Sequence, residues 1–277
     1  MRRRLDVEMV RRRLVPSRTQ ALEAIGRGAV LVGGAVAEKA ARLVSEADPI
    51  VIVAGAPKYV SRGGHKLEAA LDRFVLDVAG LTVLDVGAST GGFSDCVLQR
   101  GAAKVIAVDV GSGQLHEKLR ADPRVEVHER CNVRTQALAT VLSGRTLSFV
   151  VGDLSFISLR TVAPTLLAAV KHEASLVLLV KPQFEAGRSE VAKGRGVIRD
   201  PEVWRRVLAE VGDTYGRGGA GMMAVMPSPI TGADGNVEFL ARFDVLPAVA
   251  HIAIAAMIDI VVDEAIALHG RAPLESS

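Results

Sequence analysis

The sequence predicts an α/β fold, a doubly wound sheet of seven strands whose last strand is antiparallel, preceded by a small α+β domain. Two observations predict the sheet. From residue 81 onward, strand-like apolar runs alternate five times with helical patterns, which favours parallel strands joined by right-handed crossovers. The last two strand-like runs are joined by a Gly/Pro/Asp-rich turn without a helix, so they must pair as a hairpin.

Each element of the sheet is identified from hydrophobic periodicity and from Gly and Pro breaks. Strands are expected near residues 82–86, 104–110, 124–128, 147–152, 175–181, 222–227 and 237–243. Helices are expected near residues 65–74, 92–100, 113–121, 134–142, 159–171 and 201–214. This order of elements predicts a Rossmann-like sheet with helices on both faces.

The N-terminal region predicts two short helices followed by short strands. Leu5 and Met9 lie near one face of the first helix, and Ser17 caps the second. Strands are expected at residues 30–32, 35–36 and 47–53. The chain is therefore divided into a small domain at 1–57, a linker at 58–64, the sheet domain at 65–244, and a C-terminal helix and tail at 245–277.

Positive charge is concentrated at the N-terminus. Residues 1–66 contain 13 Lys/Arg and 6 Asp/Glu, a surplus of seven, so the remainder nets to minus four. Residues 1–66 therefore form a basic head, and residues 67–277 are mildly acidic. This distribution predicts that the head binds a polyanion. Arginines spaced along a helix neutralise the phosphates of a folded RNA, and the scarcity of aromatic residues here argues against base stacking on single strands. The candidate phosphate contacts are Arg4, Arg11, Arg12, Arg18 and, in the linker, Arg62.

Cysteine usage and the apolar segments predict a cytoplasmic protein. Cys96 and Cys131 lack metal-ligand spacing, so a reduced compartment and no bound metal are expected. The arginines at the N-terminus are not followed by an apolar core, unlike those of a signal peptide. The longest apolar stretch, residues 245–268, carries a thin acidic stripe without Lys or Arg. We therefore expect it to be buried against the sheet or a partner and not in a membrane.

A glycine-rich loop follows the first strand of the sheet. In TVLDVGASTGGF, residues 82–93, Asp85, Gly87 and Gly91 form the pattern D-x-G-x-[GS]-x-G, which is typical of enzymes that bind S-adenosylmethionine (SAM). The glycines let the backbone approach the methionine moiety closely, and the start of the following helix offers free N–H groups. The dinucleotide motif G-x-G-x-x-G differs, because Ser89 stands where its second glycine belongs. The SAM contacts expected here are Asp85, Gly87, Ala88, Ser89, Gly91, Gly92 and Phe93.

Two further positions are candidates for the adenosine moiety. Asp109 ends the second strand, about twenty residues beyond the glycine loop, where a carboxylate can accept both ribose hydroxyls. Asn132 follows the third strand, where the adenine base would lie. Two alternatives stay open. Asp109 could be an ordinary aspartate at a strand end, and the glycine loop could be the turn of any βα unit.

Four charged residues are candidates for catalysis. Asp153 ends the fourth strand and Lys181 the fifth. Because ligands bind outside the carboxyl edge of such sheets, both side chains are expected to face the methyl-donor pocket, and Asp153 to contact the donor as well. Lys66 lies on the helix before the first strand, and Glu238 on the last strand. The order lysine, aspartate, lysine, glutamate is that of the tetrad in ribose 2′-O-methyltransferases.

Such a tetrad suits methyl transfer to a hydroxyl. The hydroxyl must lose its proton as it attacks the sulfonium methyl group, and a ribose 2′-OH is too weakly acidic to do so unaided. A buried lysine near a second ammonium group can act as the base. We expect Lys181 to be the base or chief activator, with Asp153 and Lys66 beside it and Glu238 as orienting group.

Other methyl acceptors are disfavoured by the loop after the fourth strand. Enzymes that methylate exocyclic amines carry [ND]-P-P-[FYW] there, whereas this sequence has Asp153-Leu154-Ser155-Phe156 without proline. A cytosine-C5 enzyme needs a nucleophilic cysteine in that loop or the next, and neither cysteine of this chain is there. Oxygen is therefore the expected target.

These motifs together resemble a known family. The N-terminal region resembles the S4 RNA-binding module at Leu5, Arg11, Ser17, Arg18, Ala21, Ile25, Gly28, Val30, Val32, Gly33 and Gly34. Four further motifs follow this module: S-R-G-x-H-K-L at 61–67, between the two domains, LDVGASTGGF at 84–93, D-L-S-F-I-S-L at 153–159 and V-K-P-Q-F-E at 180–185. Together, residues 2–244 resemble the hemolysin A family of FtsJ-like ribosomal RNA cytidine 2′-O-methyltransferases. The resemblance implies SAM as cofactor, ribosomal RNA or ribosomal subunits as partner, and cytidine ribose as acceptor.

Two alternatives from other functional classes accompany this interpretation. The family's traditional name suggests a membrane-lytic protein, which would need a spanning or cationic amphipathic segment, whereas the only candidate segment has an acidic stripe. A non-catalytic RNA-binding factor in ribosome assembly would keep the fold, and the complete tetrad argues against it.

Overall fold

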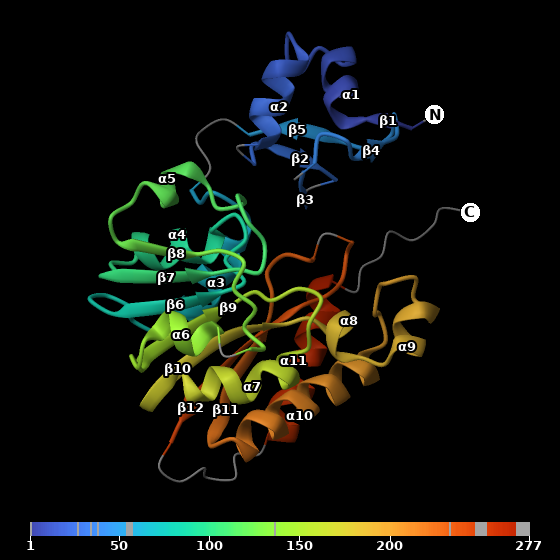
Figure 1. Ribbon diagram of the computed structural model, residues 1–277. Helices are drawn as coiled ribbons and strands as arrows, with labels where there is room; N and C mark the ends of the chain where they lie inside the picture. The colour runs from blue at the N-terminus through green and yellow to red at the C-terminus, as the bar shows by residue number, and fades with distance from the viewer. Residues whose placement is uncertain are drawn as a thin grey trace. The chain divides into compact units, whose positions relative to one another are not determined.

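The structure is a computed structural model of the 277-residue chain. It describes residues 2–26, 28–33, 35–37, 39–53, 58–135, 137–232, 234–246 and 254–269. The chain divides into two compact units, Met1–Gly64 and His65–Ser277. Figure 1 labels the helices and strands of both units.

The first unit is a small α+β domain, as expected. Helices α1 (Leu5–Arg11) and α2 (Arg18–Gly26) pack against each other. Strand β2 (Val30–Val32) pairs antiparallel with β3 (Ala35–Val36) and β5 (Ile50–Ile52). A two-stranded sheet of β1 (Arg3–Arg4) and β4 (Leu43–Val44) is additional to the elements expected from the sequence. The buried core consists of Leu5, Met9, Ala21, Ala24, Ile25, Val30, Val32, Ala37, Val44 and Ile50.

The second unit contains the seven-stranded sheet. Its strands are β6 (Thr82–Val86), β7 (Lys104–Val108), β8 (Val125–His128), β9 (Leu147–Gly152), β10 (Val170–Val180), β11 (Ala220–Pro227) and β12 (Phe239–Val245). Their order is β11-β12-β10-β9-β6-β7-β8. Strands β6 to β10 pair in parallel, while β12 lies antiparallel between β10 and β11. The prediction of seven strands with an antiparallel last strand is confirmed.

The helices of this unit lie close to the predicted positions, with differences at the ends. They are α3 (Gly63–Arg73), α4 (Gly92–Gln99), α5 (Glu117–Arg120), α6 (Ala137–Leu142), α7 (Leu159–Ala168), α10 (Pro201–Arg217) and α11 (Ile254–His269). Helix α5 starts later than expected because the ring of His116 accepts a bond from Lys118 N and caps it there. Two short helices, α8 (Pro182–Glu185) and α9 (Arg188–Lys193), were not predicted, since each is too short to show helical periodicity.

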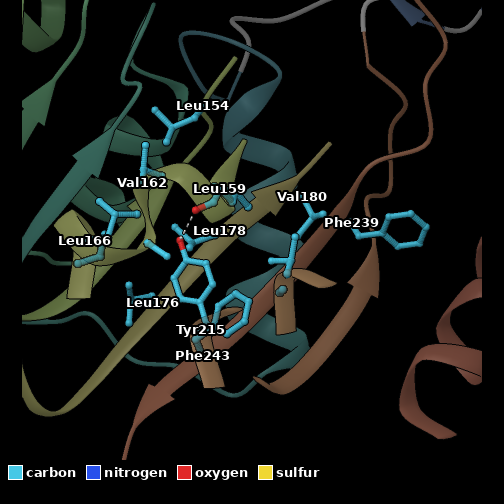
Figure 2. Packing of buried hydrophobic residues seen from close by; sticks show 14 of the residues in the cluster. Leu154, Leu159, Val162, Leu166, Leu176, Leu178, Val180, Tyr215, Phe239 and Phe243 are labelled. Carbon is cyan, nitrogen blue, oxygen red and sulfur yellow. Dashed lines mark hydrogen bonds between the residues drawn. The ribbon is translucent and has the colours of Figure 1, made fainter. Parts of the chain in front are cut away.

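A continuous apolar core joins the sheet to its helices. Tyr215 of α10 stacks on Phe243 of β12, and the two ring centres are 4.3 Å apart. Figure 2 shows the two rings side by side. The buried hydroxyl of Tyr215 donates to the carbonyl oxygen of Leu159 at 3.3 Å, so the start of α7 is tied to α10. Trp204 of α10 likewise donates from its indole to Ile198 O at 3.1 Å. The core therefore fixes the carboxyl ends of β9 and β10, from which the candidate site is built.

Helix α11 packs on α10 and β11. It buries Ile258, Val261, Val262 and Ala265. Its acidic stripe forms ion pairs, from Asp259 and Asp263 to Arg205 at 3.0 and 3.1 Å, and from Glu264 to Arg73 at 2.7 Å. The sequence predicts burial against the sheet or a partner; one face of the described helix packs on α10 and β11, whereas Ile260 and Leu268 on its other side are exposed. Residues 247–253 lie outside the described part. None of the described helices is long and apolar enough to cross a membrane.

Candidate functional site

The glycine loop makes a tight left-handed turn between β6 and α4. Gly87 and Gly91 have φ values of +80° and +96°, and Ser89 lies between them at +50°. A Cβ atom at Gly87 would lie 2.8 Å from the carbonyl oxygen of Asp153, and one at Gly91 would collide with the side chain of Leu119. Both positions therefore require glycine, for conformation and for space. Gly91 is also the N-cap residue of α4. Because glycine has no side chain, it cannot bond the N–H groups of the first helical turn.

Asp85 is the buried acid beneath this loop. Its Oδ2 accepts a hydrogen bond from Ser94 Oγ at 2.6 Å, while its Oδ1 is buried without a hydrogen-bond partner. Burial raises the pKa of Asp85 to about 7, the negative charge of Asp153 adds to this rise, and the bond from Ser94 opposes it. An unsatisfied carboxyl oxygen at this place fits the approach of a cationic ligand group.

Asp109 is held at the end of β7 by two backbone groups. Ser89 N donates to its Oδ2 at 2.8 Å, and Gly111 N donates to its Oδ1 at 2.6 Å. The carboxylate thereby links the glycine loop to the next loop. A hollow beside it is lined by Ala88, Ser89, Ala107, Asp109, Gly111, Gln114, Leu115, Val127 and Glu129.

Asn132 is not among the described residues that line this hollow. Its Oδ1 accepts a bond from Arg134 N at 3.0 Å in the turn before α6. Glu129, which sequence reasoning did not select, lines the hollow and accepts a bond from Gly113 N at 2.8 Å. The signal for Glu129 was its position at the end of the third strand, the same signal that pointed to Asp109.

The four residues of the expected tetrad form two ion pairs at one edge of the sheet. Lys66 Nζ donates to Glu238 Oε2 at 2.6 Å. Lys181 Nζ lies 2.6 Å from Asp153 Oδ1 and donates to Ser155 Oγ at 2.8 Å. Both lysines and Glu238 are buried. Since Val180 pairs with Phe239 in the antiparallel register, Lys181 and Glu238 stand opposite each other just beyond the last paired residues.

Close approach of β6 and β9 brings Asp153 to the glycine loop. Asp153 N donates to Val86 O at 3.1 Å, and a Cβ atom on Gly152 would lie 2.7 Å from Val86 Cγ2. Glycine at 152 is therefore what allows the two strand ends to lie this close. The ion pair of Asp153 with Lys181 consequently borders the loop that carries Gly87.

An aromatic pair lies next to the lysine–aspartate pair and was missed from the sequence. Phe156 is 91% exposed and adopts a left-handed backbone conformation with φ of +63°. Its ring centre is 5.2 Å from that of Phe184, and Lys181 Nζ lies 5.8 Å from the Phe184 ring centre. A bulky residue held exposed at positive φ is a strained arrangement of the kind that marks functional sites. The motif D-L-S-F-I-S-L contains Phe156, but no sequence pattern reports its exposure.

The head arginines surround two buried acids on α1. Asp6 accepts bonds from Arg4 at 3.0 Å and from Arg18 at 2.7 Å. Glu8 accepts a bond from Arg11 at 2.7 Å. These arginines lower the pKa of Asp6 and of Glu8 to about 2, so the pairs stay charged at neutral pH. Arg4, Arg11 and Arg18 still expose about half of their side chains.

Arg12 differs from the other three. It donates to Glu8 Oε1 at 2.8 Å and to the carbonyl oxygens of Ser45 and Asp48, also at 2.8 Å. These bonds hold α1 against the 45–48 turn, and 20% of the Arg12 side chain is exposed. Its contact with phosphate stays a prediction. Arg62 is partly buried in the segment before α3.

Comparisons with known proteins agree with this geometry. The model of the FtsJ-like methyltransferase family matches residues 59–244, and that of the S4 domain matches residues 3–50. A 16S/23S rRNA (cytidine-2′-O)-methyltransferase, TlyA of Mycobacterium tuberculosis, is 47% identical over 86% of this chain and 88% of its own length. Hemolysin A of Brachyspira hyodysenteriae is 40% identical over 87% of this chain and 99% of its own. The solved structure of a putative hemolysin from Streptococcus thermophilus has a TM-score of 0.76 at 36% identity and covers 98% of both chains.

Proposed function

This chain belongs to the FtsJ-like methyltransferase family, and from that premise we propose that it transfers a methyl group from SAM to the 2′-hydroxyl of a cytidine ribose in ribosomal RNA. The observation that carries the proposal is the pair of ion pairs, Lys66–Glu238 and Lys181–Asp153, beside the glycine loop. The relative from M. tuberculosis, whose name states this reaction, supports the choice of acceptor. Because ribosomes lie in the cytoplasm, we assign the chain to that compartment.

The residues of the two ion pairs have different roles in this proposal. When bound, SAM supplies an electrophilic methyl group on a sulfonium. Lys181 acts as its neutral amine, formed when the ammonium group of the ion pair gives up one proton before the reaction; the amine then takes the proton of the attacking hydroxyl. Asp153 and Ser155 hold its Nζ in position. Lys66, fixed by Glu238, orients the ribose. The buried setting strengthens these interactions relative to water.

The loop residues fit a bound SAM. Asp85 supplies an unsatisfied carboxyl oxygen for the methionine ammonium group, and the turn at Gly87 leaves room where a side chain would meet Asp153. Asp109, which lines the same hollow as Glu129, is proposed to accept the ribose hydroxyls. The remaining proposed contacts are Ala88, Ser89, Gly91, Gly92, Phe93, Asn132 and Asp153.

SAM affinity is expected to rise with pH because of Asp85. With a pKa of about 7 the carboxyl is mostly protonated at pH 5.5 and half ionised near pH 7. A bound ammonium group favours the carboxylate, so Kd should fall by up to about tenfold per pH unit below that pKa. Calorimetric titration between pH 5.5 and 7 checks this. In Asp85→Asn binding should be weaker and its pH dependence flatter; an unchanged slope in this variant would exclude Asp85 as the linked group.

Phe156 is proposed to stack on the base of the target nucleotide. Phe156→Ala should weaken RNA-dependent turnover by about tenfold to a hundredfold, the range for loss of one base–aromatic contact, while SAM affinity stays unchanged. Phe156→Tyr should retain most of the activity. Val75→Ala is the matched control, because Val75 is also exposed and at positive φ. Equal turnover of Phe156→Ala and wild type would remove this residue from the RNA site.

Incubation with methyl-labelled SAM and isolated ribosomal subunits tests the substrate. We expect label in the RNA of the small subunit, the large subunit or both, and none in ribosomal protein. Label found only in protein would exclude ribosomal RNA as the acceptor.

A further inference from the structure

The segments 153–158 and 181–185 carry the proposed catalytic pair, and they are joined at three places. The first joint is the contact of Lys181 with Asp153 and Ser155, and the second is the pair of aromatic rings. The third joint is at Glu185, the last residue of α8. The proposed reaction gives this carboxylate no role, although Glu185 is the last residue of the V-K-P-Q-F-E motif.

Glu185 is buried and all its carboxylate partners come from the start of α7. Its Oε1 accepts a bond from Leu159 N at 2.6 Å. Its Oε2 accepts bonds from Ser158 Oγ at 2.5 Å and from Arg160 Nε at 3.2 Å. Only 4% of Glu185 is exposed, and a carboxylate this buried requires such partners. The side chain therefore fixes the end of segment 153–158 to the end of segment 181–185.

Arg160 anchors this joint to the body of the domain. Its Nη2 donates to the carbonyl oxygen of Glu185 at 2.5 Å, and its Nη1 donates to Glu210 Oε2 at 2.6 Å. Glu210 lies on α10, which packs against both α7 and α8. The Glu185 joint is thus held by a 17-residue helix of the core.

Segment 153–158 has no regular secondary structure, so its shape depends on how its two ends are held. One end is tied to β6 by the bond from Asp153 N to Val86 O. The other end is tied to Glu185. Between them the backbone turns left-handed at Phe156. We propose that Glu185 is a positioning residue, which holds this segment so that Asp153, Ser155 and Phe156 face Lys181 and the target nucleotide.

This inference rests on the proposed function, and single-turnover methyl transfer to ribosomal RNA tests it. The rate is measured at saturating SAM and RNA and expressed per SAM-binding site, so that loss of folded protein does not count. Glu185→Ala should lower the rate by about a hundredfold, the scale for misplacing catalytic groups by about 1 Å. Glu185→Gln keeps an oxygen for Leu159 N but loses the second one, and should fall about tenfold. SAM affinity should stay within twofold of wild type in both.

Glu190→Ala is the matched control. Glu190 also accepts a bond from a backbone group at a helix start, Gly187 N at 3.0 Å, and pairs with an arginine, Arg206 at 2.7 Å. Neither of these described contacts joins it to segment 153–158. Its rate per site should equal that of wild type. If Glu185→Ala does not fold, Glu185→Gln decides alone. A Glu185→Gln rate within twofold of wild type would overturn the inference, whereas an inactive wild type would contradict the proposed function instead.

Discussion

Lys181→Ala is expected to lower the rate of methyl transfer by about 10²- to 10⁴-fold, the contribution of a general base. Without the amine, no described group at the carboxyl end of β10 takes the hydroxyl proton, and Asp153 loses its partner at 2.6 Å. SAM binding should be nearly unchanged, because the proposed contacts of the glycine loop remain. Single-turnover kinetics with labelled SAM, combined with calorimetric SAM binding, measure both quantities.

Lys193→Ala provides the control for this substitution, because Lys193 is an exposed lysine at the end of α9. It should methylate RNA at the wild-type rate. Lys181→Arg retains a positive charge but cannot give a neutral base, so it should be as inactive as Lys181→Ala. Full activity in Lys181→Arg would assign Lys181 an electrostatic role, and full activity in Lys181→Ala would remove it from the mechanism.

Removal of residues 1–57 is expected to weaken RNA binding strongly and to leave SAM affinity nearly intact. All proposed SAM contacts lie in the second unit, whereas the surplus of positive charge lies in residues 1–66. RNA binding measured against salt concentration, and SAM binding measured by calorimetry, separate the two effects. A truncated chain that bound and methylated RNA as well as the whole chain would contradict the assignment of the head as RNA anchor.

Single substitutions sharpen this test. Arg11→Gln and Arg18→Gln should each reduce the slope of log affinity against log salt by roughly one, as expected for one lost phosphate contact. Arg12→Gln should instead lower the stability of the head, because its nitrogens bond Glu8 and the 45–48 turn. Arg217→Gln, at an exposed arginine of α10, is the control and should leave the slope unchanged.

Much of the fold could be predicted because buried parallel strands form apolar runs with clear ends. Strands 82–86 and 147–152 have the predicted bounds. Strand β10 begins at Val170, earlier than expected. The sequence does not show this start, because Lys171, His172 and Glu173 are polar and the pairing with β9 shifts register after Val170. Helix α6 starts at Ala137 because Asn132 and Thr135 make a hydrogen-bonded turn before it. Local hydrogen bonds of this kind leave no periodic signal.

The sequence predicts which residues form the candidate site better than it predicts how their side chains pair. Strand ends and motif order point to Asp153, Lys181 and Glu238. The register of β10 and β12 sets Lys181 opposite Glu238, yet the ion pairs are Lys181–Asp153 and Lys66–Glu238, which no sequence pattern reports. The exposure of Phe156 and the internal bonds of Arg12 depend on the packing of distant segments. Sequence reasoning therefore finds the residue types at a sheet edge, whereas their partners require the structure.

The position of the transferred methyl group tests the central claim most directly. Ribosomal RNA methylated by the protein is digested to nucleosides and analysed by mass spectrometry, and the site is mapped by alkaline cleavage, which a 2′-O-methyl group blocks. We predict 2′-O-methylcytidine and a single protected linkage at each modified site, both absent with Lys181→Ala. Methyl label on a cytosine ring carbon or amine, with alkaline cleavage unimpeded, would contradict the account.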